Sequence, residues 1–263
     1  MLQYRHIVMG MPNSPIARMA NYLTFEPLED DFKVGLSRSD CEYCIDGSGE
    51  WIKLPKGTYT PPINVGQIIS FKGNLTPVSD FGIGQFSFFK RCNLKGNIMS
   101  LAYGDEAKEK TNARNWQFYR LFRNCPVVSV DSHFLPATLL GAYCYMELFR
   151  ECTSLIQAPM LPATIIGNSA YSNMFYSCTS LETAPVLPMP TSMGLGCYGG
   201  MFQYCKKLSY IKALFQYPNN TTFITNWVLG VASDGIFVKA KGAEFPIGDN
   251  GIPEGWTVEE VAV

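Results

Sequence analysis

The middle of the chain repeats one pattern of apolar positions. Residues 145–155, 171–181 and 198–208 superpose without gaps, and a degenerate copy at residues 118–128 precedes them. Each copy carries a phenylalanine at the same position and, three residues later, a cysteine: Phe122 and Cys125, Phe149 and Cys152, Phe175 and Cys178, Phe202 and Cys205. The step of 26 or 27 residues lies within the roughly 20 to 29 residues of leucine-rich repeats, so it predicts stacked units with one continuous core.

The spacing within each unit predicts a short helix followed by an extended segment. Four residues of one unit fall at i, i+3, i+4 and i+7, which is typical of one face of an α-helix: Tyr171, Met174, Phe175 and Cys178. Residues 181–187 continue with apolar positions at three-residue steps, and a proline follows them. Helices are therefore expected to form one wall of the stack, and short parallel strands the other. On that helix model, Glu147, Arg150 and Glu151 are expected on an exposed face.

The flanking regions have a different pattern, dominated by short β-prone runs. Residues 22–104 alternate such runs with turn residues, which favours a small β-sandwich. Residues 216–263 lack the repeat signature and are expected to cover the exposed end of the stack, with Trp227 and Trp256 as anchors. The predicted fold class is α+β: an N-terminal β-sandwich-like domain, a leucine-rich-repeat solenoid of about four units over residues 105–215, and a C-terminal β cap.

Composition narrows the possible partners. Charged residues make up 16% of the chain and the formal net charge is −1, whereas a typical soluble domain has about 25% charged residues. The chain therefore offers nothing that attracts nucleic acid. The apolar runs are shorter than those of a signal peptide or a membrane span, so we expect synthesis in a reducing cytoplasm and no membrane insertion.

Nine cysteines raise the question of a metal or redox site. The four repeat cysteines fall on the inward face of their units, and neighbouring helices would hold them too far apart for disulfides. The pair Cys41 and Cys44 has no second ligand pair for zinc and no strand-to-helix setting for redox chemistry. We interpret the cysteines as small core residues and expect neither a metal nor a cofactor.

The repeat unit at residues 145–164 resembles the leucine-rich repeat of BspA-type surface proteins, which are abundant in gut anaerobic bacteria and their phages. Residues 96–105 resemble the segment that leads into the first repeat of such proteins, and residues 208–258 resemble their ending. The resemblance implies a non-catalytic recognition or adhesion role and supplies no catalytic residue. Because no secretion signal precedes the repeats, we expect a phage or prophage virion component. A bacterial cell-surface adhesin and a cytoplasmic protein-interaction module stay open as alternatives.

Two segments are candidates for contact with partners. In each strand, the two residues between core positions are free to vary and form a candidate binding strip for a host surface protein or glycan, although a merely solvated sheet edge explains them equally well: Ser129, Val130, Ile156, Gln157, Glu182, Thr183, Ser209 and Tyr210. Residues 1–21 are unusually apolar for a chain end and are expected to attach the protein to another virion or surface protein: Met1, Leu2, Tyr4, Ile7, Val8, Met9 and Met11. Because the strip is short, we also expect a homo-oligomer, which would supply avidity.

Overall fold

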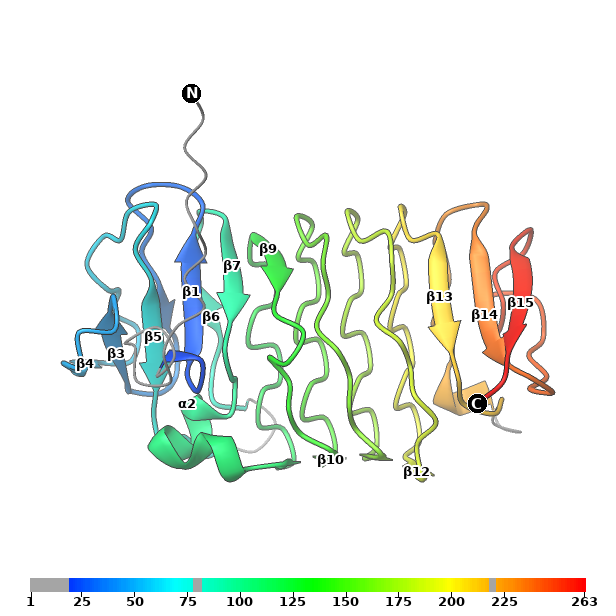
Figure 1. The fold of residues 1–263 in the computed structure, drawn as a ribbon, viewed down its shortest axis with the longest axis horizontal. Helices are drawn as coiled ribbons and strands as arrows, with labels where there is room; N and C mark the ends of the chain where they lie inside the picture. Colours follow the sequence, from blue (N-terminus) through cyan, green and yellow to red (C-terminus); the bar gives the residue numbers. More distant parts are fainter. Residues whose placement is uncertain (1–18, 78–81, 218–220) are drawn as a thin grey trace.

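A computed structural model describes residues 19–77, 82–217 and 221–263 of the chain. The protein is mostly sheet, with 25% strand and 5% helix. Figure 1 shows the elements following one another along the long axis of the molecule, from an N-terminal sheet through the repeats to a C-terminal sheet. One hydrophobic core runs through all three regions, from Leu23 to Trp256.

The N-terminal region is built around a six-stranded sheet with the strand order β4-β3-β5-β1-β7-β9. Its strands are β1 (Leu23–Pro27), β3 (Cys41–Ile45), β4 (Ile52–Leu54), β5 (Ile69–Lys72), β7 (Cys92–Lys95) and β9 (Val127–Val130). Two further short strands, β2 (Gly35–Leu36) and β6 (Phe86–Ser87), pair with each other. The buried face of the sheet presents aromatic rings, and Phe25 contacts Phe71 and Phe86 edge to face.

The predicted N-terminal sandwich is wrong, because the sheet does not end where the repeats begin. Strand β9 belongs to the first repeat and pairs in parallel with β7. In a separate sandwich, one edge of β7 would have unpaired backbone groups. Here β9 pairs with that edge, so it is not left exposed. Core residues on both sides of this junction belong to the same hydrophobic cluster, so the first repeat and the N-terminal sheet share one core.

The repeats stack in parallel. Strands β8 (Asn112–Ala113), β10 (Leu139–Leu140), β11 (Ile165–Ile166) and β12 (Ser192–Met193) form one narrow sheet. A short helical turn, α2 (Ser100–Tyr103) with η2 (Gly104–Glu109), leads into them. After the last repeat come β13 (Tyr210–Ala213), η3 (Thr221–Phe223), β14 (Ile236–Ala240) and β15 (Thr257–Val261), and the three strands form a parallel sheet.

The predicted repeat helices are also wrong, since each helical pattern folds as consecutive tight turns. Every second N–H donates to the next repeat: that of Tyr171 to the carbonyl oxygen of Cys197 (2.9 Å) and that of Asn173 to that of Gly199 (2.8 Å). The intervening N–H groups close local turns, as from Met174 to Tyr171 (3.1 Å). Left-handed residues recur at every fourth position, at Ser169, Asn173 and Ser177, and such residues do not continue an α-helix. The predicted helix-and-strand solenoid with a sandwich is thus corrected to a mostly sheet protein of stacked turns and short strands.

Rows of identical side chains fill the core of the stack. The Phe149, Phe175 and Phe202 rings are parallel, with successive centroids 5.8 Å apart. The expectation that the repeat cysteines lie in the core is confirmed, because all are buried. Each of the last three repeat thiols donates to a phenylalanine carbonyl oxygen of the preceding unit, for example Cys178 to Phe149 (3.1 Å), whereas Cys125 donates to that of Phe86 in β6 (3.4 Å). At the C-terminal end, the buried Trp227 covers the phenylalanine row, with its ring centroid 6.3 Å from that of Phe202.

Candidate functional site

The predicted binding strip lies on the outward side of the strands and short extended segments that follow the repeat turns, a surface that we call the sheet face. Parallel bridges join Ser129 to Gln157 and Thr183 to Tyr210, and Tyr210 pairs onward with Ile236 of β14. All the predicted strip residues except Val130 are at least partly exposed. The structure therefore brings the strip residues of neighbouring repeats together in two pairs, the first beside β9 and the second beside β14.

Val130 is a wrong prediction, because its side chain is fully buried in the core. The first repeat has one residue fewer between its cysteine and its first core position: Val127 follows Cys125, whereas Leu155 follows Cys152 three residues on. The exposed pair of the first repeat is consequently Val128 and Ser129. An alignment on the cysteine alone therefore predicts Ser129 and Val130 for the first repeat, one residue beyond the pair that is exposed.

Large apolar side chains are exposed beside the strip in the two middle repeats. Their exposed fractions are 59% for Ile156, 55% for Met160, 48% for Val186 and 48% for Met189. Met160 and Val186 each follow a proline at the equivalent position of consecutive units. Exposed apolar side chains that gather in one region mark surfaces for protein contact, whereas scattered ones carry no such meaning.

The same face continues onto the N-terminal sheet as a polar chain of contacts. The Ser129 hydroxyl donates to Asn93 Oδ1 (2.7 Å), and Asn93 Nδ2 donates to Glu26 Oε2 (2.8 Å). Lys95 Nζ donates to the other Glu26 oxygen (2.7 Å). Burial acts to raise the pKa of Glu26, but the hydrogen bonds from Asn93 and Lys95 outweigh it and hold the pKa below its ordinary value.

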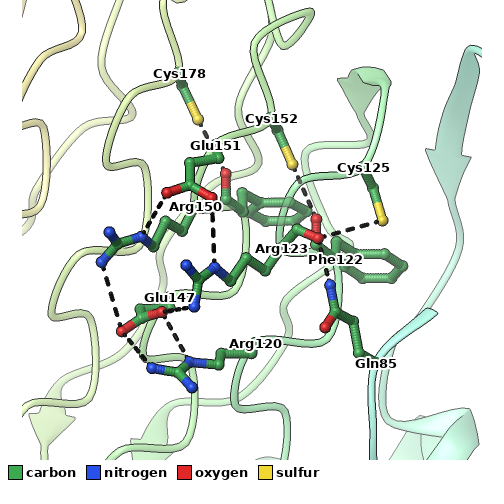
Figure 2. A network of polar contacts seen from close by, with 11 residues as sticks. Gln85, Arg120, Phe122, Arg123, Cys125, Glu147, Arg150, Glu151, Cys152 and Cys178 are labelled. Atoms are coloured by element: carbon green, nitrogen blue, oxygen red, sulfur yellow. Dashed lines mark hydrogen bonds and ion pairs between the residues drawn. The ribbon is translucent and has the colours of Figure 1, made fainter. Parts of the chain in front are cut away.

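A second group of polar side chains lies on the turns of the first two repeats. It includes Glu147, for which the predicted helix gave an exposed position and which is buried. Figure 2 shows the carboxylate of Glu147 among the guanidinium groups of Arg120, Arg123 and Arg150, at 2.8, 3.3 and 3.7 Å. The Glu147 side chain is only 5% exposed. Glu151 joins the network through Arg150 (3.1 Å) and Arg123 (3.5 Å). We call these five residues the arginine network.

Three members of the arginine network have an unusual backbone conformation. Arg120, Glu147 and Glu151 have φ values of 58°, 56° and 64°, a region that costs a residue with a Cβ about 1–2 kcal/mol relative to the right-handed region. In later repeats the Glu147 position is occupied by Asn173 and Gly200, which tolerate this region better, whereas the Glu151 position is occupied by Ser177 and Tyr204. Positive φ values recur at these positions throughout the repeats, so the conformation belongs to the repeat architecture and does not by itself mark a site.

Two adjoining grooves border the arginine network. One, of about 460 Å³, is lined by Phe89, Arg123 and Glu151, and the other, of about 500 Å³, by Arg38, Tyr119 and Arg120. Ser37 and Gln85 belong to both linings. Phe89 lies between β6 and β7 and is 87% exposed. We call the two together the Phe89 groove. We did not predict it from the sequence; the one signal in the sequence is the charged Glu147 at a turn position that has Asn173 and Gly200 in later repeats.

The described parts of the chain were searched for other kinds of site. Within residues 19–77, 82–217 and 221–263, no group of three or more His, Cys, Asp or Glu residues could hold a metal ion. No helix in those same ranges is long and apolar enough to cross a membrane. All nine cysteines are buried free thiols, and burial raises the pKa of Cys41 to about 12. The predicted attachment residues, Met1 to Met11, lie outside the described residues.

No protein-family model, curated protein or solved structure matches the chain. Its function must therefore be inferred from its own surfaces. Two of these stand out among the described residues: the sheet face that carries the strip, and the Phe89 groove.

Proposed function

We propose that the chain is a non-catalytic recognition protein that binds a partner protein through its sheet face. The observation that carries this proposal is the contrast between the two sides of the strands. Inward positions repeat from unit to unit, as at Leu155, Leu181 and Leu208, whereas the outward positions beside them differ. A rigid, repeated core that presents non-repeating side chains is the arrangement by which stacked-repeat proteins recognise partners.

The exposed apolar side chains supply the energy for such binding. Full burial of one Ile, Val or Met side chain contributes about 1.5–3 kcal/mol, and Ile156, Met160 and Val186 are each about half exposed. Covering all three therefore contributes on the order of 3 kcal/mol, which corresponds to a factor of about 100 in the dissociation constant. A single copy binds modestly on this basis, and several copies in a homo-oligomer add avidity.

The setting that fits this function best is a phage or prophage virion, with residues 1–21 attaching the protein to other virion proteins. The resemblance of the repeats to BspA-type surface proteins supports a role at a host surface, and a bacterial cell-surface adhesin is the alternative. Removal of residues 1–18 is expected to leave a folded protein that no longer joins particles. Incorporation at the normal level would refute attachment through this segment.

Binding to whole cells tests the proposed function. Fluorescently labelled full-length protein is applied to gut anaerobic bacteria, and bound protein is measured by flow cytometry before and after protease treatment of the cells. We expect protease to abolish binding and Ile156→Asp or Met160→Asp to weaken it about tenfold or more. Ile247→Asp is the matched control, since Ile247 is similarly exposed, at 65%, but lies in the connection between β14 and β15 and outside the repeats. Binding that resists protease but is lost after periodate treatment would identify a glycan and refute a protein partner.

A further inference from the structure

The Phe89 groove is a second binding surface, separate from the sheet face. It lies on the turn side of the first two repeats, the side that carries their consecutive tight turns, where residues 85–89 meet the arginine network. Gln85, from that stretch, donates to the Arg123 carbonyl oxygen (Figure 2). Its features do not serve the sheet-face strip, whose residues line neither of its two parts. We propose that the Phe89 groove binds an acidic segment of a partner protein, with a carboxylate at the arginines and an apolar side chain on Phe89.

Charge is the first reason for this assignment. The arginine network has three guanidinium groups, those of Arg120, Arg123 and Arg150, against the two carboxylates of Glu147 and Glu151, and Arg120 and Arg123 line the groove. The second carboxylate of the network, that of Glu147, is 5% exposed and lies beneath the guanidinium groups. A ligand therefore meets an excess of positive charge, and guanidinium groups bind carboxylates in a planar, bidentate geometry.

The second reason is the order of the arginine side chains. Arg120 donates to both Glu147 oxygens, at 2.8 and 3.1 Å, and its guanidinium also lies over the Tyr119 ring, 4.5 Å from the centroid. Arg123 is held by Glu147 and Glu151. Long side chains that are fixed before binding lose less rotamer entropy when a ligand arrives. The buried Glu147 thus acts as a positioning residue for the arginines.

The third reason is Phe89 itself. A phenylalanine that is 87% exposed beside a groove gains nothing for the fold. Exposed aromatic residues and arginines are the side chains most enriched at protein–protein contacts, and together they dominate binding energy there. An acidic saccharide offers carboxylates as well, but it has no apolar side chain to cover the exposed Phe89 ring, so the composition of the groove favours a peptide.

An array of random heptapeptides provides the test, with acidic oligogalacturonate as the saccharide probe. The full-length protein is expected to select peptides that combine Asp or Glu with an apolar residue, and raised salt should weaken their binding. Phe89→Ala and Arg123→Gln should each weaken the selected peptides about tenfold. Arg114→Gln is the matched control, because Arg114 is exposed and lines neither part of the groove.

Several results would overturn this inference. They are a lack of selection on the array, selection of peptides without acidic residues, equal binding by Phe89→Ala and wild type, or a preference for oligogalacturonate. Misfolding does not confuse the outcome, since truncating a side chain as exposed as Phe89 leaves the core intact. The test is also independent of the sheet face, because Ile156→Asp should leave peptide binding unchanged.

Discussion

Replacing one ring in the phenylalanine row measures how strongly the repeats hold one another. Phe175 is fully buried, and its ring is stacked between those of Phe149 and Phe202, at interplanar angles of 9° and 3°. A buried Phe→Ala change costs about 3–5 kcal/mol in typical cores. Phe175 loses ring contacts on both sides, so we expect Phe175→Ala to lower the free energy of unfolding by an amount near the upper end of that range.

Urea unfolding followed by circular dichroism and tryptophan fluorescence gives this free energy. The matched control is Phe89→Ala, the same chemical change at an exposed position, which should alter stability by less than about 0.5 kcal/mol. A loss below about 1 kcal/mol for Phe175→Ala would refute the continuous stacked row. A loss of similar size for both variants would refute the distinction between the buried and exposed rings.

Three further predictions concern the turns, the thiols and the arginine network. Because Ser177 has a φ of 57°, Ser177→Gly should raise the free energy of unfolding by about 0.5–1 kcal/mol. Ser180→Gly, at a position without positive φ, is the control and should lower it by a similar amount. Equal effects of the two changes in urea unfolding would contradict the turn geometry. Burial raises the pKa of the Cys41, Cys152 and Cys205 thiols to about 12, against about 8.5 in an unfolded chain. The folded state therefore keeps these protons to higher pH, so stability should be constant up to about pH 8 and then fall by up to about 1.4 kcal/mol per pH unit for each such thiol. Urea midpoints that do not change between about pH 8 and pH 10 would contradict this. Glu147→Gln removes charge-assisted hydrogen bonds and should cost about 1–3 kcal/mol in thermal or urea unfolding; an unchanged stability would show that the network is loose.

The sequence was informative about which residues point inward and misleading about the backbone that carries them. Tyr171, Met174, Phe175 and Cys178 are all buried, as their spacing predicts. Turns with a left-handed residue at every fourth position bring residues i, i+3, i+4 and i+7 to one side, just as an α-helix does. The deciding difference lies in the partners of the N–H groups, half of which are in the next repeat, and periodicity within one unit cannot reveal them.

The two candidate surfaces differ in how far the sequence could predict them. The sheet-face strip follows from the alignment of repeats, apart from Val130, where the first repeat is one residue shorter. The Phe89 groove joins β6 and the turn after it to the first two repeats, which come much later in the chain. Glu147 is buried beside this groove by three arginines that come together only in the folded protein. Sequence spacing alone therefore predicts an ordinary exposed face for Glu147.

The most direct measurement of recognition at the sheet face is site-specific photocrosslinking on bacterial cells. A benzoylphenylalanine is placed at position 183, on the strip, or at position 204, on the turn side, where Thr183 and Tyr204 are both exposed in the wild type. We predict that position 183 crosslinks to a cell-surface protein, that excess unlabelled protein competes, and that position 204 gives no such product. Crosslinking from position 204 alone, or from neither position while the protein stays bound to the cells, would contradict recognition through the sheet face.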